Sequence, residues 1–197
     1  VKNNLQTVSS LLRIQGRRLE SPEAKTAVDE SVRRIQSIAV IHEMLAASGG
    51  DEVELTEVVE PIMAMAETSL VSSDRPIRFR LVGQGPTLSA SKASSLAVVI
   101  TELLQNAIEH GFPPGTEGGA ITVELVNGPT ELRVRVHDDG IGVPVGFDAA
   151  DSGGLGLTII STLMAGELGG ELKIQPATEP QRGTVAEVKV QIGDGPD

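Results

Sequence analysis

Residues 100–112 read ITELLQNAIEHGF and close a long apolar segment that predicts a helix over residues 89–110. Within this helix Glu102, Asn106 and His110 recur at every fourth residue, so their side chains project from one side. A carboxylate, an amide oxygen and an imidazole in one row suit a divalent cation that bridges phosphates, and Glu102 is placed to orient or deprotonate a nucleophile. Taken alone, the row is as compatible with a solvated helix face as with a site.

A second element follows the predicted strand 132–138, where the chain reads Asp138-Asp139-Gly140-Ile141-Gly142. A carboxylate at the end of a strand can accept a hydrogen bond from an exocyclic amine, while Gly140 and Gly142 let the backbone approach a flat base. Taken alone, an Asp-Gly pair after a strand is more often an ordinary turn.

A third element, SGGLGL at residues 152–157, opens a helix predicted over residues 155–168. The backbone amides of Gly154, Leu155 and Gly156 would lie at a helix N-terminus, where phosphate oxygens are readily bound. A sharp loop-to-helix corner would also explain the glycines. The three elements in this order favour a nucleotide site over three separate structural explanations.

The first part of the chain predicts two helices, residues 1–19 and 22–45, joined by the helix-starting Ser21-Pro22 pair. Their apolar stripes cannot be covered within one antiparallel hairpin, so we expect a homodimer in which two hairpins form a four-helix bundle. The glycine pair in ASGG, residues 47–50, predicts a domain boundary. We therefore expect a hairpin domain at residues 1–50 and a second domain at residues 51–197.

The second domain alternates helical and strand patterns, which predicts an α+β fold. Its sheet should be mostly antiparallel and covered by helices on one face, a two-layer α/β sandwich. The expected helices are 55–73, 89–110 and 155–168, and the expected strands are 77–82, 121–126, 132–138, 171–174 and 184–192.

The composition excludes several classes of partner. The net charge of −11 without any run of Lys or Arg argues against nucleic acid and anionic membranes as partners. No cysteine is present and the three histidines are scattered, so a zinc site is not expected and any metal should be held by oxygen. No apolar run is long enough to insert into a membrane, which predicts a cytoplasmic protein.

The three elements resemble the N, G1 and G2 boxes of the ATPase fold shared by histidine kinases, gyrase, Hsp90 and MutL. Gly183-Thr184 resembles the final glycine-threonine motif of that fold. The resemblance implies ATP and Mg²⁺ as cofactors, with Asn106 on magnesium, Asp138 on the adenine amino group and Glu102 as the catalytic acid of the N box. It implies that the nucleotide is also bound by the remaining positions of these motifs: His110, Gly140, Gly142, Gly154, Leu155, Gly156 and Thr184.

The opening VKNNLQTVSSLLRIQGRR resembles the dimerisation helix of the HisKA_2/HWE-like histidine kinases, whose acceptor motif reads His-Arg-Val-Lys-Asn-Asn-Leu-Gln. The resemblance is greatest to actinobacterial soluble kinases of two-component systems. It implies an upstream sensor domain and an acceptor histidine two residues before Val1, from which phosphate passes to an aspartate of a response regulator receiver domain. It also places regulator specificity on exposed residues of the first helix, such as Gln6, Ser9, Ser10 and Arg13. His42 is rejected as the acceptor because the residues after it do not match.

The sequence departs from the family pattern in three places. Glu109 stands where many histidine kinases have a phosphate-binding lysine, and its charge would repel a triphosphate unless the side chain points away. Ser152 replaces the first glycine of the G2 box, and the expected ATP lid, residues 143–153, is short. Two alternatives therefore stay open: a degenerate nucleotide-binding dimeric regulator or phosphatase, and an anti-sigma-factor serine kinase.

Overall fold

The structure is a computed structural model of the 197-residue chain, and it describes residues 2–47, 51–70, 76–149, 154–178 and 181–192. The chain divides into two compact units, Val1–Gly50 and Asp51–Asp197. None of the helices in the described ranges combines the length and the hydrophobicity needed to cross a bilayer.

The first unit is an antiparallel hairpin of α1 (Lys2–Gly16) and α2 (Pro22–Ala47). Ser21 caps α2, because its Oγ accepts a hydrogen bond from the Ala24 N–H at 3.3 Å, and Pro22 occupies the first helical position as the sequence predicts. The two helices approach closely where α1 ends. A Cβ placed on Gly16 would lie 2.9 Å from Val28 Cγ1, so glycine permits this spacing.

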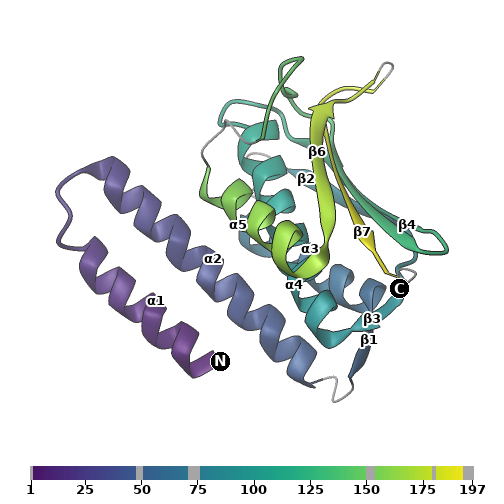
Figure 1. The fold of residues 1–197 in the computed structure, drawn as a ribbon. Helices are drawn as coiled ribbons and strands as arrows, with labels where there is room; N and C mark the ends of the chain where they lie inside the picture. The colour runs from purple at the N-terminus through teal and green to yellow at the C-terminus, as the bar shows by residue number, and fades with distance from the viewer. Residues whose placement is uncertain (1, 48–50, 71–75, 150–153, 179–180, 193–197) are drawn as a thin grey trace. The chain divides into compact units, whose positions relative to one another are not determined.

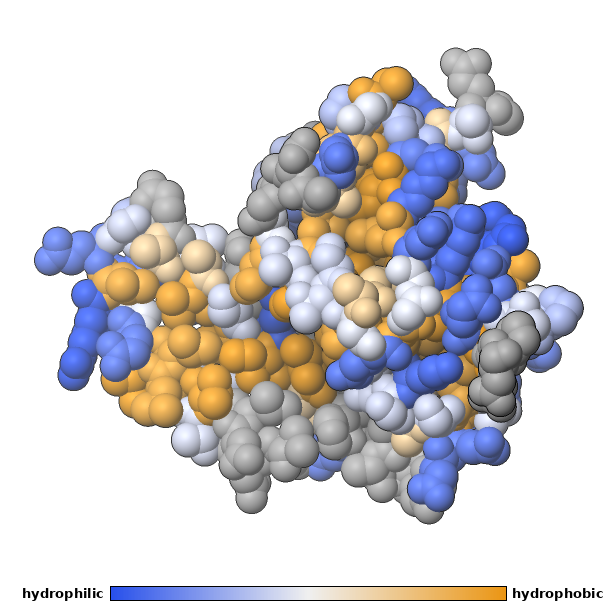
Figure 2. All heavy atoms as spheres, in the orientation of Figure 1, coloured by the Kyte–Doolittle hydropathy of each residue, from blue (hydrophilic) through white to orange (hydrophobic). Residues whose placement is uncertain are grey.

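One side of the hairpin carries uncovered apolar side chains, and Figure 2 shows a broad hydrophobic area over the two helices. Val8 and Leu11 on α1 keep 44% and 55% of their surface exposed, and Val40 on α2 keeps 42%. Ser9, in contrast, is only 5% exposed on the side of α1 that meets α2. The expectation that Ser9 is an exposed, partner-reading residue is therefore wrong, because the helical period turns it into the hairpin.

The second unit is built on a five-stranded sheet in the order β2-β4-β5-β7-β6. β2 and β4 run parallel and the other neighbours run antiparallel, so the mostly antiparallel sheet is confirmed. A separate pair, β1 and β3, was not predicted, because three-residue strands show no periodicity. The strand bounds are β1 Glu52–Glu54, β2 Ile77–Gly83, β3 Thr87–Ser89, β4 Gly119–Asn127, β5 Glu131–Asp138, β6 Gly170–Pro176 and β7 Thr184–Gln191.

Three helices cover one face of this sheet: α3 (Leu55–Leu70), α4 (Ala90–Asn106) and α5 (Leu155–Leu163) (Figure 1). Two of them continue into short π-helices, η1 (Ala107–Gly111) after α4 and η2 (Met164–Leu168) after α5. Alternate residues of β4, β5 and β7 point toward the helices, and Val123, Val134 and Val188 are fully buried there. The two-layer α+β sandwich predicted from the sequence is confirmed.

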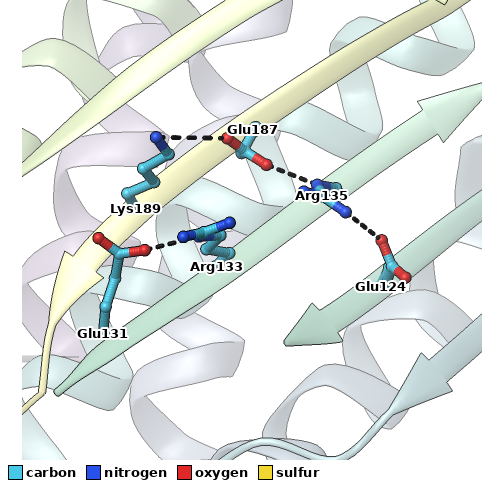
Figure 3. A network of polar contacts seen from close by, with 6 residues as sticks. All are labelled: Glu124, Glu131, Arg133, Arg135, Glu187 and Lys189. Carbon is cyan, nitrogen blue, oxygen red and sulfur yellow. Dashed lines mark hydrogen bonds and ion pairs between the residues drawn. The ribbon is translucent and has the colours of Figure 1, made fainter. Parts of the chain in front are cut away.

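The other face of the sheet is polar and carries a row of charges across three strands (Figure 3). Arg135 on β5 stands directly opposite Glu124 on β4 and Glu187 on β7. Its guanidinium lies 3.0 Å from Glu124 and 2.5 Å from Glu187, and these hydrogen bonds raise the pKa of Arg135. The charges alternate in sign across the strands, as expected for a face that meets water.

Candidate functional site

The centre of the site is a buried carboxylate at the end of β5. The strand alternation turns Asp138 to the helix-covered face, where it is 3% exposed. Its Oδ1 accepts hydrogen bonds from the N–H of Gly140 at 3.0 Å and from the N–H of Thr184 at 3.3 Å. Burial raises the pKa of the Asp138 carboxyl, while these two backbone hydrogen bonds and one from the Thr184 side chain act against the rise.

Glycines bring three separate segments against this carboxylate. The Ile141 N–H donates to the Gly111 carbonyl at 2.9 Å, so the loop after β5 is joined to the end of η1. A Cβ on Gly111 would lie 2.8 Å from Asp138 Oδ1, and one on Gly183 would overlap the Asp138 backbone. Gly142 has a φ of 76°, a conformation that other residues rarely adopt. The loop therefore needs its glycines for close packing as well as for its turn.

The predicted row of polar residues lies along α4 and η1. Glu102 is buried at 2% exposure, Asn106 is half-buried as the last residue of α4, and His110 is exposed within η1. The predicted helix 89–110 thus changes to π-geometry immediately after Asn106, which the sequence does not reveal. π-turns inside helices are frequent at functional sites. Asn106 makes no side-chain capping bond to the π-helix, which leaves its amide oxygen for another partner.

Glu109, the acid at the expected lysine position, is held by a neighbour on the preceding turn. The Gln105 Nε2 donates a hydrogen bond to Glu109 Oε1 at 2.8 Å, and Gln105 is only 4% exposed. Gln105 lies one α-helical step, about 100°, from Asn106. The hydrogen bond therefore holds the Glu109 carboxylate beside Gln105.

The glycine-rich element begins α5. Gly154 is the residue before the helix, Leu155 is half exposed in the first turn, and Gly156 is buried. No atom lies within 4 Å of a Cβ built on Gly154, so its surroundings are open. The expected lid is described only up to Ala149, and Ser152 and Gly153 lie outside the described residues.

The donor set fits the nucleotide and metal that the sequence predicts. Asp138 offers a buried acceptor for an amine, Gly140 and Gly142 let the loop after β5 pack against Gly111 and Gly183 beside it, and α5 presents the amides of its first turn. The described residues contain no group of three His, Asp or Glu that could hold a metal ion by themselves. A magnesium ion would thus be held by the neutral oxygen of Asn106 together with phosphate oxygens, a combination that Mg²⁺ prefers.

Sequence reasoning missed two residues of this region, Gly111 and Gln105. Gly111 follows the polar row directly, but a glycine after a helix normally indicates only a C-cap. Gln105 is four residues before Glu109, a spacing that permits their hydrogen bond without predicting it. The Lys92 ammonium donates to the Gln191 carbonyl at 3.3 Å, and Arg182 is exposed.

Two family models match the chain. Residues 1–70 match a histidine kinase model, and residues 91–194 match the model of histidine kinase-, DNA gyrase B- and HSP90-like ATPases. The second match contains every predicted site residue, from Glu102 to Thr184.

Curated relatives extend the match over nearly the whole chain. The sensor histidine kinase PdtaS of Mycobacterium tuberculosis is 45% identical over 98% of this chain, and PdtaS of Mycolicibacterium smegmatis is 47% identical over the same share. In both cases the chain spans 38% of the relative's length.

Solved structures agree on the fold. The histidine kinase domain of a blue-light-activated kinase from Erythrobacter litoralis matches 98% of this chain and 87% of its own, with a TM-score of 0.65 at 22% identity. Together with the two family models and the site geometry, these matches lead to one conclusion: the chain belongs to the sensor histidine kinase family and carries its ATP-binding kinase domain.

Proposed function

We propose that the chain binds Mg-ATP in residues 51–197 and uses it to phosphorylate a histidine, from which the phosphoryl group passes to an aspartate of a response regulator. The observation that carries the proposal is the Asp138 carboxylate, buried at the end of β5 and joined by backbone hydrogen bonds to two glycine-bearing loops. A buried carboxylate can select an amine such as that of adenine, because a ligand without a donor at this point would lose that hydrogen bond.

Each site residue then has a role in binding or positioning. Asp138 accepts from the adenine amino group, and Gly140 and Gly142 let the base approach the loop. The amides that begin α5 and the side chain of His110 contact phosphates. Asn106 holds magnesium, which supplies charge neutralisation at the transferred phosphoryl group. Glu102 positions or deprotonates the attacking imidazole.

The acceptor is expected two residues before Val1, as the similarity of VKNNLQ to the family's acceptor motif implies. PdtaS, which matches 98% of this chain, is named a sensor histidine kinase, which supports a histidine rather than a serine as the acceptor. The helical hairpin also argues against the alternative that the chain is an anti-sigma-factor serine kinase. The response regulator and the upstream sensor domain remain parts of the proposal.

The hairpin is proposed to mediate homodimerisation through its exposed apolar side. Val8, Leu11 and Ile14 keep 44–55% of their surface exposed. Exposed apolar side chains that lie together in this way are unfavourable in water and often mark a protein interface. Leu11→Glu should therefore convert a dimer to a monomer in sedimentation analysis, whereas Arg13→Glu, about 160° away around the same helix, should leave the dimer intact. A monomeric wild type would refute this part.

Nucleotide binding is tested by calorimetry with a non-hydrolysable ATP analogue and magnesium. Asp138→Ala should weaken binding roughly 10–100-fold, because a hydrogen bond to a charged acceptor contributes about 1.5–3 kcal/mol. Asp139→Asn is the matched control, since the Asp139 carboxylate accepts from the Ala120 N–H at 2.7 Å and serves the loop. Asn106→Asp should lose the dependence of affinity on magnesium. Equal affinity in wild type and Asp138→Ala would refute the proposed site.

A further inference from the structure

The hairpin contains a groove that the kinase reaction does not use. It has a volume of about 570 Å³ and lies between α1 and α2 near their connection. Its floor is formed by Gly16 and Val32, both buried, and its size is within the range of small-molecule sites. The glycine at its floor is the residue that allows the close helix approach to Val28.

Cationic side chains from both helices surround this groove. Arg13 lines it from α1, Arg17 from the turn that follows α1, and Lys25 and Arg33 from α2. Asp29 is the one acidic residue of the lining and is four residues from both Lys25 and Arg33, so the lining keeps an excess of three positive charges.

This concentration of charge is unusual for the chain. Residues 1–50 carry seven Lys and Arg against five Asp and Glu, whereas residues 51–197 carry nine against 22. Arg17 follows the last residue of α1, and its N–H donates to the Arg13 carbonyl at 3.2 Å, so the two like charges lie one turn apart and repel each other. A bound anion would offset that repulsion.

Arg13 lies on a different side of α1 from the exposed apolar residues. With about 100° per residue, Arg13 is roughly 140–160° around α1 from Val8 and Leu11 and 100° from Ile14. Burial of Val8 and Leu11 against a second hairpin would therefore leave the Arg13 side of the groove accessible. The Arg13 guanidinium is held across the hairpin by Gln36 Oε1 at 3.3 Å, which ties one wall to the other.

We propose that this groove binds a small phosphorylated anion. Three of the four cations are arginines, whose planar guanidinium groups bind phosphate oxygens through paired hydrogen bonds. A phosphate ester or pyrophosphate carries several negative charges and can compensate the three excess positive charges of the lining. A monocarboxylate, with one negative charge, would leave most of that positive charge uncompensated. The site belongs to the hairpin and is independent of the ATP site in residues 51–197.

The test is a titration of the ¹⁵N-labelled chain with pyrophosphate in the presence of EDTA, followed by amide NMR. Saturable shifts are expected for residues 13–17 and 25–33. Because the readout is resolved by residue, pyrophosphate bound at the ATP site is recognised by shifts in the second unit and does not confuse the result. Arg17→Gln and Lys25→Gln should each raise the dissociation constant about tenfold, in line with a charge-assisted hydrogen bond.

Arg18→Gln is the matched control, because Arg18 is exposed, adjacent to Arg17 and absent from the groove lining. It removes the same charge and should change the dissociation constant less than about twofold. Equal weakening by Arg17→Gln and Arg18→Gln would show diffuse attraction and overturn the proposal. So would the absence of saturable shifts in the hairpin, or binding of a glutamate-rich peptide at the groove without binding of pyrophosphate. Unchanged amide shifts elsewhere in each variant establish that the hairpin is folded.

Discussion

The buried amide of Gln105 donates a hydrogen bond to the Glu109 carboxylate at 2.8 Å, on the side of the α4–η1 helix next to the row of Asn106 and His110. An acid three residues after the proposed magnesium ligand is unfavourable for a site that binds a triphosphate. The hydrogen bond keeps the carboxylate oriented along the helix surface. The chain thus tolerates Glu109 through a partner on the preceding turn.

Neutralising this acid should strengthen nucleotide binding. Glu109→Gln removes one negative charge near the phosphates and should raise the affinity for Mg-ATP about two- to fivefold, corresponding to roughly 0.5–1 kcal/mol of screened repulsion. Calorimetry at low and high salt measures the effect, which should shrink as salt is added. Glu171→Gln makes the same charge change on an exposed residue of the edge strand β6 and should have no effect. If both variants bind like the wild type, Glu109 is too far from the phosphates to matter.

Asp138→Asn should separate stability from binding. Because burial raises the folded-state pKa of Asp138, the native state holds this proton more tightly than the unfolded chain. The corresponding stability is present below the unfolded pKa of 3.8 and is lost as the pH rises through the folded-state pKa. The Asp138→Asn side chain has no carboxyl group to deprotonate, so the variant does not lose this stability. The Tm of the variant minus the Tm of the wild type should therefore increase from acid to neutral pH.

The same variant should bind ATP roughly tenfold or more weakly, because an amide is a poorer acceptor than a carboxylate. Thermal unfolding over a pH series and calorimetry at neutral pH provide the two measurements. A Tm difference that does not change with pH would mean that the folded-state pKa of Asp138 is not raised.

Gly111→Ala tests the close packing between η1 and the loop after β5. The new Cβ would lie 2.8 Å from Asp138 Oδ1, and that carboxylate is held in place by Gly140 and Thr184. We expect a loss of about 1–3 kcal/mol in stability, typical of overpacking, together with weaker ATP binding. Gly166→Ala is the control, because a Cβ there has no atom within 4 Å. Chemical denaturation that shows equal stability for the two variants would contradict the account.

The charged row on the open face of the sheet should contribute modestly to stability. Arg135→Met removes contacts to both Glu124 and Glu187 and should cost about 1 kcal/mol, since the pairs are partly exposed. Arg133→Met breaks one contact, to Glu131 on its own strand, and should cost less than about 0.5 kcal/mol. Urea unfolding at two salt concentrations compares them. The Arg135 variant should approach the wild type at high salt, and a salt-independent loss would indicate packing rather than charge.

Most of the helices and strands were predictable from the periodicity of apolar residues in the sequence. Long segments such as α2 and α4, and alternating strands such as β5, are recognisable because one face of each is apolar. The π-helix η1 and the pair β1–β3 were not predictable, since π-geometry has no simple sequence signal and three residues show no period. The side of α1 that carries Ser9 was also misassigned, because the sequence does not show which helix face the hairpin buries.

The candidate site was predictable where residue type alone indicates chemistry. Asn106, Asp138 and the glycines around them are polar or flexible residues at the ends of predicted elements. The order of their motifs along the chain favoured a single nucleotide site. Contacts between elements were not predictable. The sequence places Gly111 and Gly183 more than 70 residues apart, and only the fold brings both against one carboxylate.

The central claim is ATP-dependent phosphorylation of a histidine, and the most direct test uses labelled ATP with a protein that extends upstream of Val1. The account predicts acid-labile, base-stable label that disappears in Asn106→Asp and in the acceptor histidine→Gln variant. Acid-stable label on serine, or nucleotide binding with no label in the extended protein, would contradict it.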